Sequence, residues 1–555
     1  MTMDADYFVG LLHYFIPLPV VLPLFAAGVK LALGARWPRV QRWLSVVSLT
    51  LVLVIGFVLM IGSHAYGPQT VQVGGWEAPI GITLVADRLS ALMVTVSAAI
   101  TLTVLVYSIG QGMVGKAEVA PLSVYQPTYL ILVAGVSNAF LAGDLFNLFV
   151  GFEILLTASY VLLTLGGTQS RMRAGAIYVV VSLVSSLLFL IAIALIFGAT
   201  GTVNMAQLGE RLPDLSNDLR AVLQIVLLFA FGIKAAVFPL AAWLPDSYPT
   251  APAPVTAVFA GLLTKVGVYT IIRTQTLLFP SEQLNNLLMV VALATMIMGI
   301  LGAVAQTDIK RLLSFTLISH IGYMVFGVAL GSVQGMAGAV FYIAHHITVQ
   351  TTLFLVTGLI ERRGGSASLD HLGGLSRIAP VLGVLFFVPA MNLGGIPPMS
   401  GFLGKLGLIQ AGVEAGTPLA YVLVGASVLT SLLTLYVIAR VWNYAFWRSP
   451  SEGMVAEPGT VLEEDTEADE SSTAAFGPGE AVGPSSRLEG ATAATTPVVT
   501  SVALPKSMVG ATVALVVFSL ALTALAGPLI TYASDAAVEL QARTPYIEAV
   551  LGGDR

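Results

Sequence analysis

The sequence predicts an all-α polytopic membrane protein with about 14 transmembrane helices. Of its 555 residues, 56% are hydrophobic and only 10% are charged, whereas a soluble domain carries about 25% charged residues. Apolar runs of roughly 20 residues, long enough to cross ~30 Å of hydrocarbon, recur along the whole chain. These runs lack the alternation of polar and apolar residues found in membrane barrels, so helices are expected.

The apolar runs are taken in chain order. The first run follows an acidic start, Asp4 and Asp6, where a signal peptide needs a positive segment, so we expect it to be retained as a span. The predicted spans, with boundaries good to a few residues, lie near residues 11–33, 41–63, 84–111, 125–143, 145–167, 175–199, 219–242, 254–277, 284–306, 312–332, 335–360, 380–411, 419–447 and 507–532.

Basic residues in the loops predict the orientation of the chain. Loops after even-numbered spans offer little beyond Arg88, Arg211 and Arg220. Loops after odd-numbered spans hold a larger set: Arg36, Arg39, Arg42, Lys116, Arg171, Arg173, Lys310, Arg311, Arg362, Arg363, Arg377, Arg448, Arg487 and Lys506. The positive-inside rule places this larger set in the cytoplasm. We therefore expect a multi-pass protein of a bacterial cell (inner) membrane with both termini external.

The segment 449–506 differs from the rest of the chain. It combines several acids, among them Glu463, Glu464 and Asp465, with many Ser, Thr, Ala, Pro and Gly residues. Such a composition buries too little apolar surface to offset the entropy of ordering. We expect a disordered cytoplasmic loop, which serves either as a spacer or as a partner-binding segment.

Four charged residues fall inside the predicted spans. Glu153 lies on the fifth span, roughly 12–14 Å below Asp144 at the outer rim if the helix rises 1.5 Å per residue. Lys234, Lys265 and Lys405 lie in the seventh, eighth and twelfth spans. A charge near the bilayer centre costs about 2.5–3.5 kcal/mol on insertion scales, so intramembrane charges tend to mark functional sites.

Ion pairing between helices is the simpler interpretation of these charges. One acid and three lysines cannot pair evenly, however, and an unpaired buried lysine is driven toward its neutral form. A lysine poised to lose a proton is a titratable relay. We therefore predict a proton-relay role for Glu153, Lys234, Lys265 and Lys405.

Prolines interrupt two of the lysine-bearing spans. Pro239 cannot donate to the carbonyl of Ala235. In the same way, Pro397 and Pro398 free the carbonyls of Leu393 and Gly394. Unwound helices beside ionisable groups recur in ion-translocating sites, although an ordinary packing kink is the alternative.

Three histidines add polar steps between the lysines. His345 and His346 lie within the eleventh span, and His320 lies in the tenth. Imidazole can both accept and donate a proton near neutral pH. Adjacent helical residues point ~100° apart, so His345 and His346 are not expected to face one path. We predict at least one of this pair in the relay, with His320 as a possible further step.

Other kinds of chemistry are not supported by the sequence. The absence of cysteine excludes disulfides, thiolate nucleophiles and cysteine-held iron–sulfur or zinc sites. No nucleotide-binding loop appears, and no His, Asp and Glu cluster has metal spacing, so we expect no cofactor, no metal and no nucleic-acid partner. Asp308, Lys310 and Arg311 are expected at the inner mouth of the tenth span. Asp246 is either a proton entry point or a loop acid.

Three long motifs make the chain resemble a known family. They are Gly143 through Leu165, Gln306 through Ser314, and Gly394 through Lys405, in that order. The chain is similar to the antiporter-like membrane subunits shared by respiratory complex I, membrane-bound hydrogenases and Mrp-type multisubunit cation/proton antiporters. It is most similar to the D subunits of the Mrp type. The resemblance covers about residues 80–447 and, more loosely, the last span.

The resemblance implies a more detailed architecture. Spans 4–8 and 9–13 would form two inverted five-helix repeats, with helices 7 and 12 discontinuous. Glu153 and Lys234 would pair, Lys265 would be the central relay, a histidine of span eleven the next step, and Lys405 the terminal lysine. The implied division of the chain is 1–124 for helices 1–3, 125–277 and 278–448 for the two repeats, 449–506 for the acidic loop, and 507–555 for the last helix and an external tail.

The resemblance also implies partners and transported ions. Such subunits work within complexes of six or seven proteins in the lipid bilayer and exchange cytoplasmic Na+ for external H+. Two departures stand out in this chain: Gln350 follows His346 where many relatives have a lysine, and the acidic loop is longer than the family needs. The path is therefore expected to run through His345/His346 directly to Lys405.

Three functions compete for these features. The first is an Mrp-type Na+/H+ antiporter subunit, which is a secondary transporter and not an enzyme. The second is a proton-pumping subunit of a complex I-like or hydrogenase redox complex. The distal complex I subunit continues into a long lateral helix, whereas only 23 residues follow position 532 here. The third is a scaffold, against which the unpaired buried charges argue.

Overall fold

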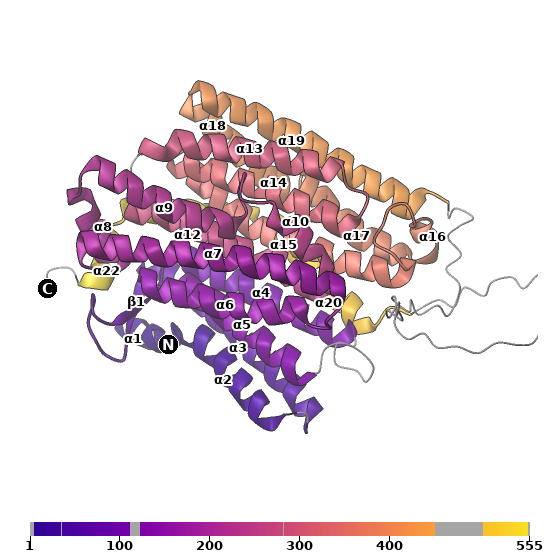
Figure 1. Cartoon of the computed structure of the whole chain (residues 1–555), viewed down its shortest axis with the longest axis horizontal. Helices are drawn as coiled ribbons and strands as arrows, with labels where there is room; N and C mark the ends of the chain where they lie inside the picture. The colour runs from indigo at the N-terminus through magenta and orange to yellow at the C-terminus, as the bar shows by residue number, and fades with distance from the viewer. Residues whose placement is uncertain (1–4, 35, 112–121, 281, 450–502, 553–555) are drawn as a thin grey trace, which may run out of the picture.

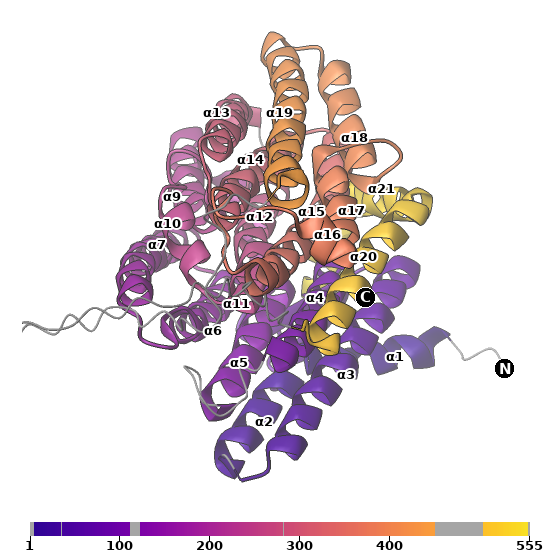
Figure 2. The same ribbon diagram turned by 90° about the vertical axis from the view of Figure 1, so that its right-hand side faces the viewer.

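The computed structural model describes residues 5–34, 36–111, 122–280, 282–449 and 503–552. These residues form a bundle of long helices that lie side by side (Figures 1 and 2). Twelve of the helices in the described part are long and apolar enough to cross a membrane. The predicted acidic loop 449–506 lies almost entirely outside the described residues.

The N-terminal part contains a short β-hairpin between its helices. Its elements are α1 (Ala5–Phe15), α2 (Leu18–Leu33), α3 (Pro38–Tyr66), β1 (Gln69–Val73), β2 (Ile82–Ala86) and α4 (Arg88–Gln111). The two strands pair antiparallel. The span predicted over residues 84–111 is present but starts later, because residues 84–86 belong to β2 and α4 begins at Arg88. An apolar run that passes from strand into helix shows no boundary in its periodicity.

The central part begins with α5 (Leu122–Leu141), α6 (Leu145–Thr164), α7 (Gln169–Thr200), α8 (Met205–Arg211), α9 (Asn217–Ala235), α10 (Trp243–Ser247), α11 (Ala253–Val258) and α12 (Thr264–Arg273). Two π-helical turns, Phe259–Leu263 and Thr274–Leu278, continue α11 and α12 into one span, Ala253–Leu278. The π-turns were not predicted from the sequence.

The remaining helices are α13 (Asn285–Val304), α14 (Ile309–Ala329), α15 (Val333–Gly364), α16 (Leu375–Ile378), α17 (Pro380–Gly394), α18 (Ser400–Ala415), α19 (Pro418–Trp442), α20 (Lys506–Ala524), α21 (Ala526–Ala542) and α22 (Thr544–Leu551). The last span was predicted to end near residue 532, but α21 continues to Ala542. Its Glu539 is buried. The segment after 532 is therefore packed helix.

The seventh and twelfth predicted spans are both broken. α9 ends at Ala235, and Ala236 adopts the left-handed conformation before α10 begins. α17 ends at Gly394, and Gly395 has a φ of 82° before α18 begins. The predicted discontinuity of both helices is confirmed by these breaks.

Matching local features occur in the two halves of the central bundle. Asp144 caps α6 by accepting from the Asn147 N–H, and Asp308 caps α14 by accepting from the Arg311 N–H. Asp144 forms an isolated antiparallel bridge with Asn204, which follows α7, and Asp308 forms one with Ser368, which follows α15. The intervening helices α7 and α15 have 32 residues each. The two halves therefore share a capping acid, an isolated bridge and a helix of the same length.

The two ends of the bundle differ in character. One end, here called the hairpin end, carries β1, β2, α8 and α22 (Figure 1). The other end carries α16 and the start of α20 and is here called the basic end, after the Lys and Arg residues of the loops that follow odd-numbered spans. The C-terminal helices α21 and α22 are fastened to the hairpin end by an Arg88–Glu539 ion pair and by Arg543, which donates to the Leu277 and Gly209 carbonyls. The most apolar stretches of Ala253–Leu278 and α15 are entirely buried at the centre.

Candidate functional site

The seven residues predicted as relay groups lie in the interior of the bundle. Glu153 is half-buried. The other six, at most 8% exposed, are Lys234, Lys265, His320, His345, His346 and Lys405. They come from six helices, α6, α9, α12, α14, α15 and α18. The fold therefore gathers residues that are up to 252 positions apart in the sequence.

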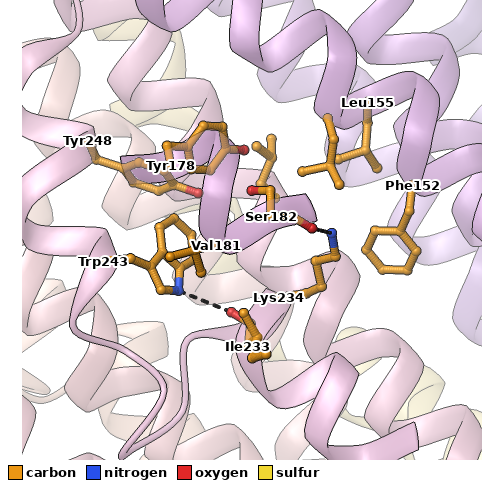
Figure 3. A pocket seen from close by; sticks show the side chains of 11 residues that line it. Phe152, Leu155, Tyr178, Val181, Ser182, Ile233, Lys234, Trp243 and Tyr248 are labelled. Carbon is orange, nitrogen blue, oxygen red and sulfur yellow. Dashed lines mark hydrogen bonds between the residues drawn. The ribbon is translucent and has the colours of Figure 1, made fainter. Parts of the chain in front are cut away.

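Lys234, in the last turn of α9, is held by α7. Its Nζ donates to the Ser186 Oγ at 3.0 Å and to the Ser182 carbonyl at 3.3 Å. Figure 3 shows the lysine pointing toward Ser182, with Phe152 on its other side. Lys234 also lines a cavity of about 20 Å³, and about 10–15 Å³ of such volume suffices for one water molecule.

Glu153 and Lys234 are not in contact in this structure. No nitrogen–oxygen pair between these two described side chains lies within 4.0 Å. The Glu153 Oε1 atom is buried and lacks a hydrogen-bond partner among the described residues. The carboxylate still acts electrostatically on Lys234. The structure thus places the predicted pair near each other in a separated arrangement.

Lys265 is the second residue after the π-helical turn Phe259–Leu263. Its Nζ donates to the Ala260 carbonyl at 2.6 Å, and no acid contacts it among the described residues. π-Turns within α-helices are frequent at functional sites. Two residues on, a Cβ at Gly267 would lie 2.9 Å from the carbonyl carbon of Lys234. This close approach of α12 and α9 brings the two lysines into neighbouring positions.

The histidines diverge from α15 toward different helices. His346 packs on His320 of α14 with ring centroids 5.1 Å apart, and the His320 Nδ1 bonds to the Tyr342 hydroxyl at 2.7 Å. His345 turns toward α18, where its Nδ1 bonds to the Ser400 hydroxyl at 2.9 Å. The predicted divergence of His345 and His346 is thus seen, yet Tyr342 lies beside both rings.

Each of these three histidines retains at least one ring nitrogen without a hydrogen-bond partner in the described part of the chain. Buried polar atoms are normally satisfied by protein or by ordered water. The free nitrogens therefore mark positions where water or a proton would be accommodated. They lie between Lys265, whose charge acts on His346, and Lys405, whose charge acts on His345.

Lys405 uses the break between α17 and α18 directly. Its Nζ donates to the Leu393 carbonyl at 3.0 Å and the Gly394 carbonyl at 3.3 Å. These are the two carbonyls that Pro397 and Pro398 were predicted to free. The ammonium also lies 5.2 Å from the centre of the Tyr323 ring. The α9 break differs, because there the Trp243 indole N–H bonds to the Ile233 carbonyl and Lys234 turns to α7.

At the basic end, charges form surface pairs. Arg311 pairs with Asp246 at 2.8 Å and Lys310 with Glu361 at 2.7 Å. The sequence left two interpretations of Asp246, a proton entry point or a loop acid. In the structure its carboxylate forms an ion pair with a residue of α14. Gln350, the departure noted in α15, donates to the Leu313 carbonyl at 2.8 Å.

Two buried basic groups were missed by the sequence analysis. Lys30 is fully buried and donates to the Gln41 carbonyl at 2.9 Å, as well as to the Ser45 and Gln126 side chains. Its place near the end of the first span gave no signal of burial. Arg273 forms an ion pair of 2.6 Å with Asp87 at the hairpin end. Its position inside an apolar run was the available signal. Neither group touches the relay residues.

No group of three or more His, Asp or Glu side chains in the described ranges is arranged to hold a metal ion. The site offers instead a row of single titratable side chains. Within this set, His346, His320, Tyr342 and His345 are in contact with one another, while Glu153, Lys234, Lys265 and Lys405 lie on the helices around them. Such an arrangement can hold and pass protons.

Comparison with known proteins identifies similar chains. The family model described as NADH:quinone oxidoreductase/Mrp antiporter, TM, matches residues 142–434, which include all seven predicted relay residues. Two proteins named as D subunits of Na(+)/H(+) antiporters are similar. The one from Alkalihalophilus pseudofirmus is 40% identical over 78% of this chain and 86% of its own length. The one from Bacillus subtilis is 38% identical over 80% and 88%.

Solved structures show the same fold. A chain in the structure of the Mrp complex from Dietzia sp. DQ12-45-1b has a TM-score of 0.83 and 34% identity, covering 97% of this chain and 99% of that one. A chain of respiratory complex I from Thermus thermophilus has a TM-score of 0.73 at 22% identity, with 97% and 100% coverage.

Proposed function

Because the chain belongs to the family of NADH:quinone oxidoreductase/Mrp antiporter membrane subunits, we propose that it translocates protons as one subunit of a multisubunit Na+/H+ antiporter. The D-type relatives and the Mrp complex structure support this assignment. The partners are then the other subunits of an Mrp-type complex. The protein is a secondary transporter subunit and not an enzyme.

One observation carries the relay. Buried titratable side chains form a row across six helices, and none of its three lysines has a carboxylate within 4.0 Å in the described chain. A structural role would favour matched ion pairs, because a buried charge left unpaired is strongly destabilising. Groups that exchange a proton with their neighbours need not remain charged. The row thus suits a relay that moves protons across the middle of the bundle.

The proposed switch is the distance between Glu153 and Lys234. When the carboxylate approaches, it holds the lysine in the charged form; two unit charges at 4 Å interact by about 4 kcal/mol at an effective dielectric constant of 20. When the two groups separate, Lys234 rests on neutral Ser182 and Ser186, and its proton tends to move toward Lys265. The separated arrangement in the structure corresponds to this second state.

The basic end faces the cytoplasm in the proposed orientation, with both termini outside a bacterial cell membrane. Two contacts support a common side for the termini. His13 bonds to the Thr70 carbonyl of β1, and the Thr70 hydroxyl donates to the Ala549 carbonyl at 3.0 Å. The beginning and the end of the described chain thus meet at the hairpin.

The proposed repeats are residues 125–277 and 278–448, related by inversion across the membrane. Residues 1–124 flank the repeats, and 507–555 add the last helices. Asp144 and Asp308, the equivalent caps, then lie on opposite sides of the membrane. The likeness of their surroundings supports this division.

Ion exchange in everted vesicles tests the function. Vesicles that contain the whole complex are expected to couple Na+ movement to proton movement without any redox substrate, because the gradient itself supplies the energy. The readout is a pH-sensitive dye after Na+ addition, with and without electron donors. Proton movement that requires an electron donor would contradict the antiporter assignment and favour a redox-driven pump.

A further inference from the structure

A cavity of about 400 Å³ opens at the hairpin end between α6, α7 and the β1–β2 turn. Most of its walls are apolar. Its lining includes Ile80, Asp144, Phe146, Leu190, Ile193 and Phe197. Asp144 is the only ionisable residue that lines it within the described chain. In the proposed orientation, the cavity lies on the outer side of the membrane.

Asp144 is firmly positioned at this cavity. Its Oδ1 accepts from the Asn147 N–H at 2.6 Å, while its Oδ2 has no partner among the described residues although the side chain is only 6% exposed. The turn that carries it is fixed on both sides, by Gly143 N–H to the Thr83 carbonyl and Leu145 N–H to the Val203 carbonyl. One carboxylate oxygen is therefore held ready for a proton or water.

Burial raises the pKa of Asp144 to about 6, against the lowering effect of the nearby backbone N–H groups. The Asn147 N–H, which bonds to Oδ1, is the largest of these lowering effects, and the nearby Phe146 and Thr83 N–H groups add smaller ones. The charge of Asp144 also acts on the hydroxyl group of Tyr546 in α22. A carboxyl group in these surroundings gains and loses its proton near neutral pH.

The same face of α7 connects the cavity with Lys234. Ser182 and Ser186, which hold the lysine, are followed at helical spacing by the cavity-lining Ile193 and Phe197. At 1.5 Å per residue, Ile193 lies roughly 10 Å beyond Ser186 along the helix. The cavity is thus placed directly outward of the Lys234 site.

Aromatic rings separate the two compartments. Phe149 packs against Phe146 at 6.2 Å and against Phe189 at 5.9 Å between ring centroids. Phe152, whose ring lies 5.6 Å from the Lys234 ammonium, packs against Phe189 at 6.1 Å. A hydrophobic constriction of this kind gates ion passage by excluding water.

From this arrangement we infer that the cavity is the outer proton vestibule of the relay, with Asp144 as its proton acceptor and Phe146, Phe149 and Phe189 as its gate. A proton from outer water converts the carboxylate to the acid, and its release to water inside the gate restores the carboxylate and delivers the proton toward Glu153 and Lys234. This inference rests on the proposed function and its orientation.

Cysteine labelling tests the vestibule, since the chain contains no natural cysteine. Ile193→Cys places a thiol in the cavity. Leu187→Cys places one outside the cavity, on the outer surface of the membrane span α7, where the side chain is 59% exposed and is expected to face lipid. A membrane-impermeant cationic methanethiosulfonate, added outside intact cells that carry the whole complex, is expected to label the first chain and spare the second. Equal labelling of both, low or high, would overturn the inference.

The acceptor role predicts a specific change in Asp144→Asn. With the pKa of Asp144 near 6, wild-type exchange should rise as outer pH falls from about 7 to 5, because the carboxyl loads over the unit on either side of its pKa. In everted vesicles of varied lumenal pH, the variant is expected to exchange several-fold more slowly with a flat profile. Asp214→Asn, an exposed acid at the same end, should match the wild type.

A wild-type rate and pH profile for Asp144→Asn would overturn its role as acceptor. The outcome is separable from the function itself. If Glu153 and Lys234 variants lose exchange while Asp144→Asn does not, the vestibule assignment fails and the relay stands. If the Glu153 and Lys234 variants exchange normally, the relay fails whatever Asp144 does.

Discussion

Everted vesicles that contain the Lys234→Ala complex are expected to show no Na+-dependent proton movement above that of vesicles without the complex. Lys234 has no carboxylate within 4.0 Å and rests on Ser182 and Ser186. Removing it deletes the group that takes the proton from the first helices to α12. The Ser186 hydroxyl and the Ser182 carbonyl lose their partner, but the neighbouring cavity has room for a water that can bond to them. Assembly of the complex is therefore expected to persist.

Glu153→Ala should have the same effect, because the lysine then lacks the acid that holds its charge. The assay is dye-reported proton movement, normalised to assembled complex on native gels. Lys506→Ala is the matched control, since that lysine is exposed and is the first residue of α20, which starts at the basic end. Near-normal exchange by both Glu153→Ala and Lys234→Ala would contradict the switch.

The second large effect is expected for Lys405. Lys405→Ala should abolish exchange in assembled complex, because the last titratable group of the row is lost. It also leaves the Leu393 and Gly394 carbonyls without their donor, so some loss of assembled complex is expected as well. An unsatisfied buried polar group costs about 1–3 kcal/mol.

Lys405→Arg separates the two roles of Lys405. Arginine supplies charge and donors to the carbonyls but keeps its proton at any physiological pH. Assembly is therefore expected to recover while exchange stays absent. The same vesicle assay and native gels report both quantities. Wild-type exchange by Lys405→Arg would show that the lysine serves only to hold the break.

The features that could be predicted from the sequence are those with a local signal. Pro397 and Pro398 predicted which two carbonyls would lack a helical donor, and in the structure both carbonyls accept hydrogen bonds from the Lys405 ammonium. Charges in apolar runs indicated four relay candidates on four helices, and histidines within two further spans indicated the other three. Proline and charge reveal themselves within a few residues because their cost inside a membrane is local.

Features that depend on distant partners could not be predicted. The holding of Lys234 by α7 depends on how two helices face each other, and ordinary serines such as Ser186 carry no signal of that contact. Burial of Lys30 arises from Gln126, 96 residues away. The hairpin strand β2 was hidden because its apolar run continues into α4. Each of these results from tertiary packing and not from periodicity.

The most direct test compares two equally buried lysines. Lys265 and Lys30 are both 0% exposed, but only Lys265 lies in the row, whereas Lys30 is held by neutral groups of α3 and α5. Vesicle exchange per assembled complex is expected to vanish in Lys265→Met and to remain at the wild-type rate in Lys30→Met. Normal exchange in Lys265→Met, or equal loss in both variants, would contradict a relay through the row.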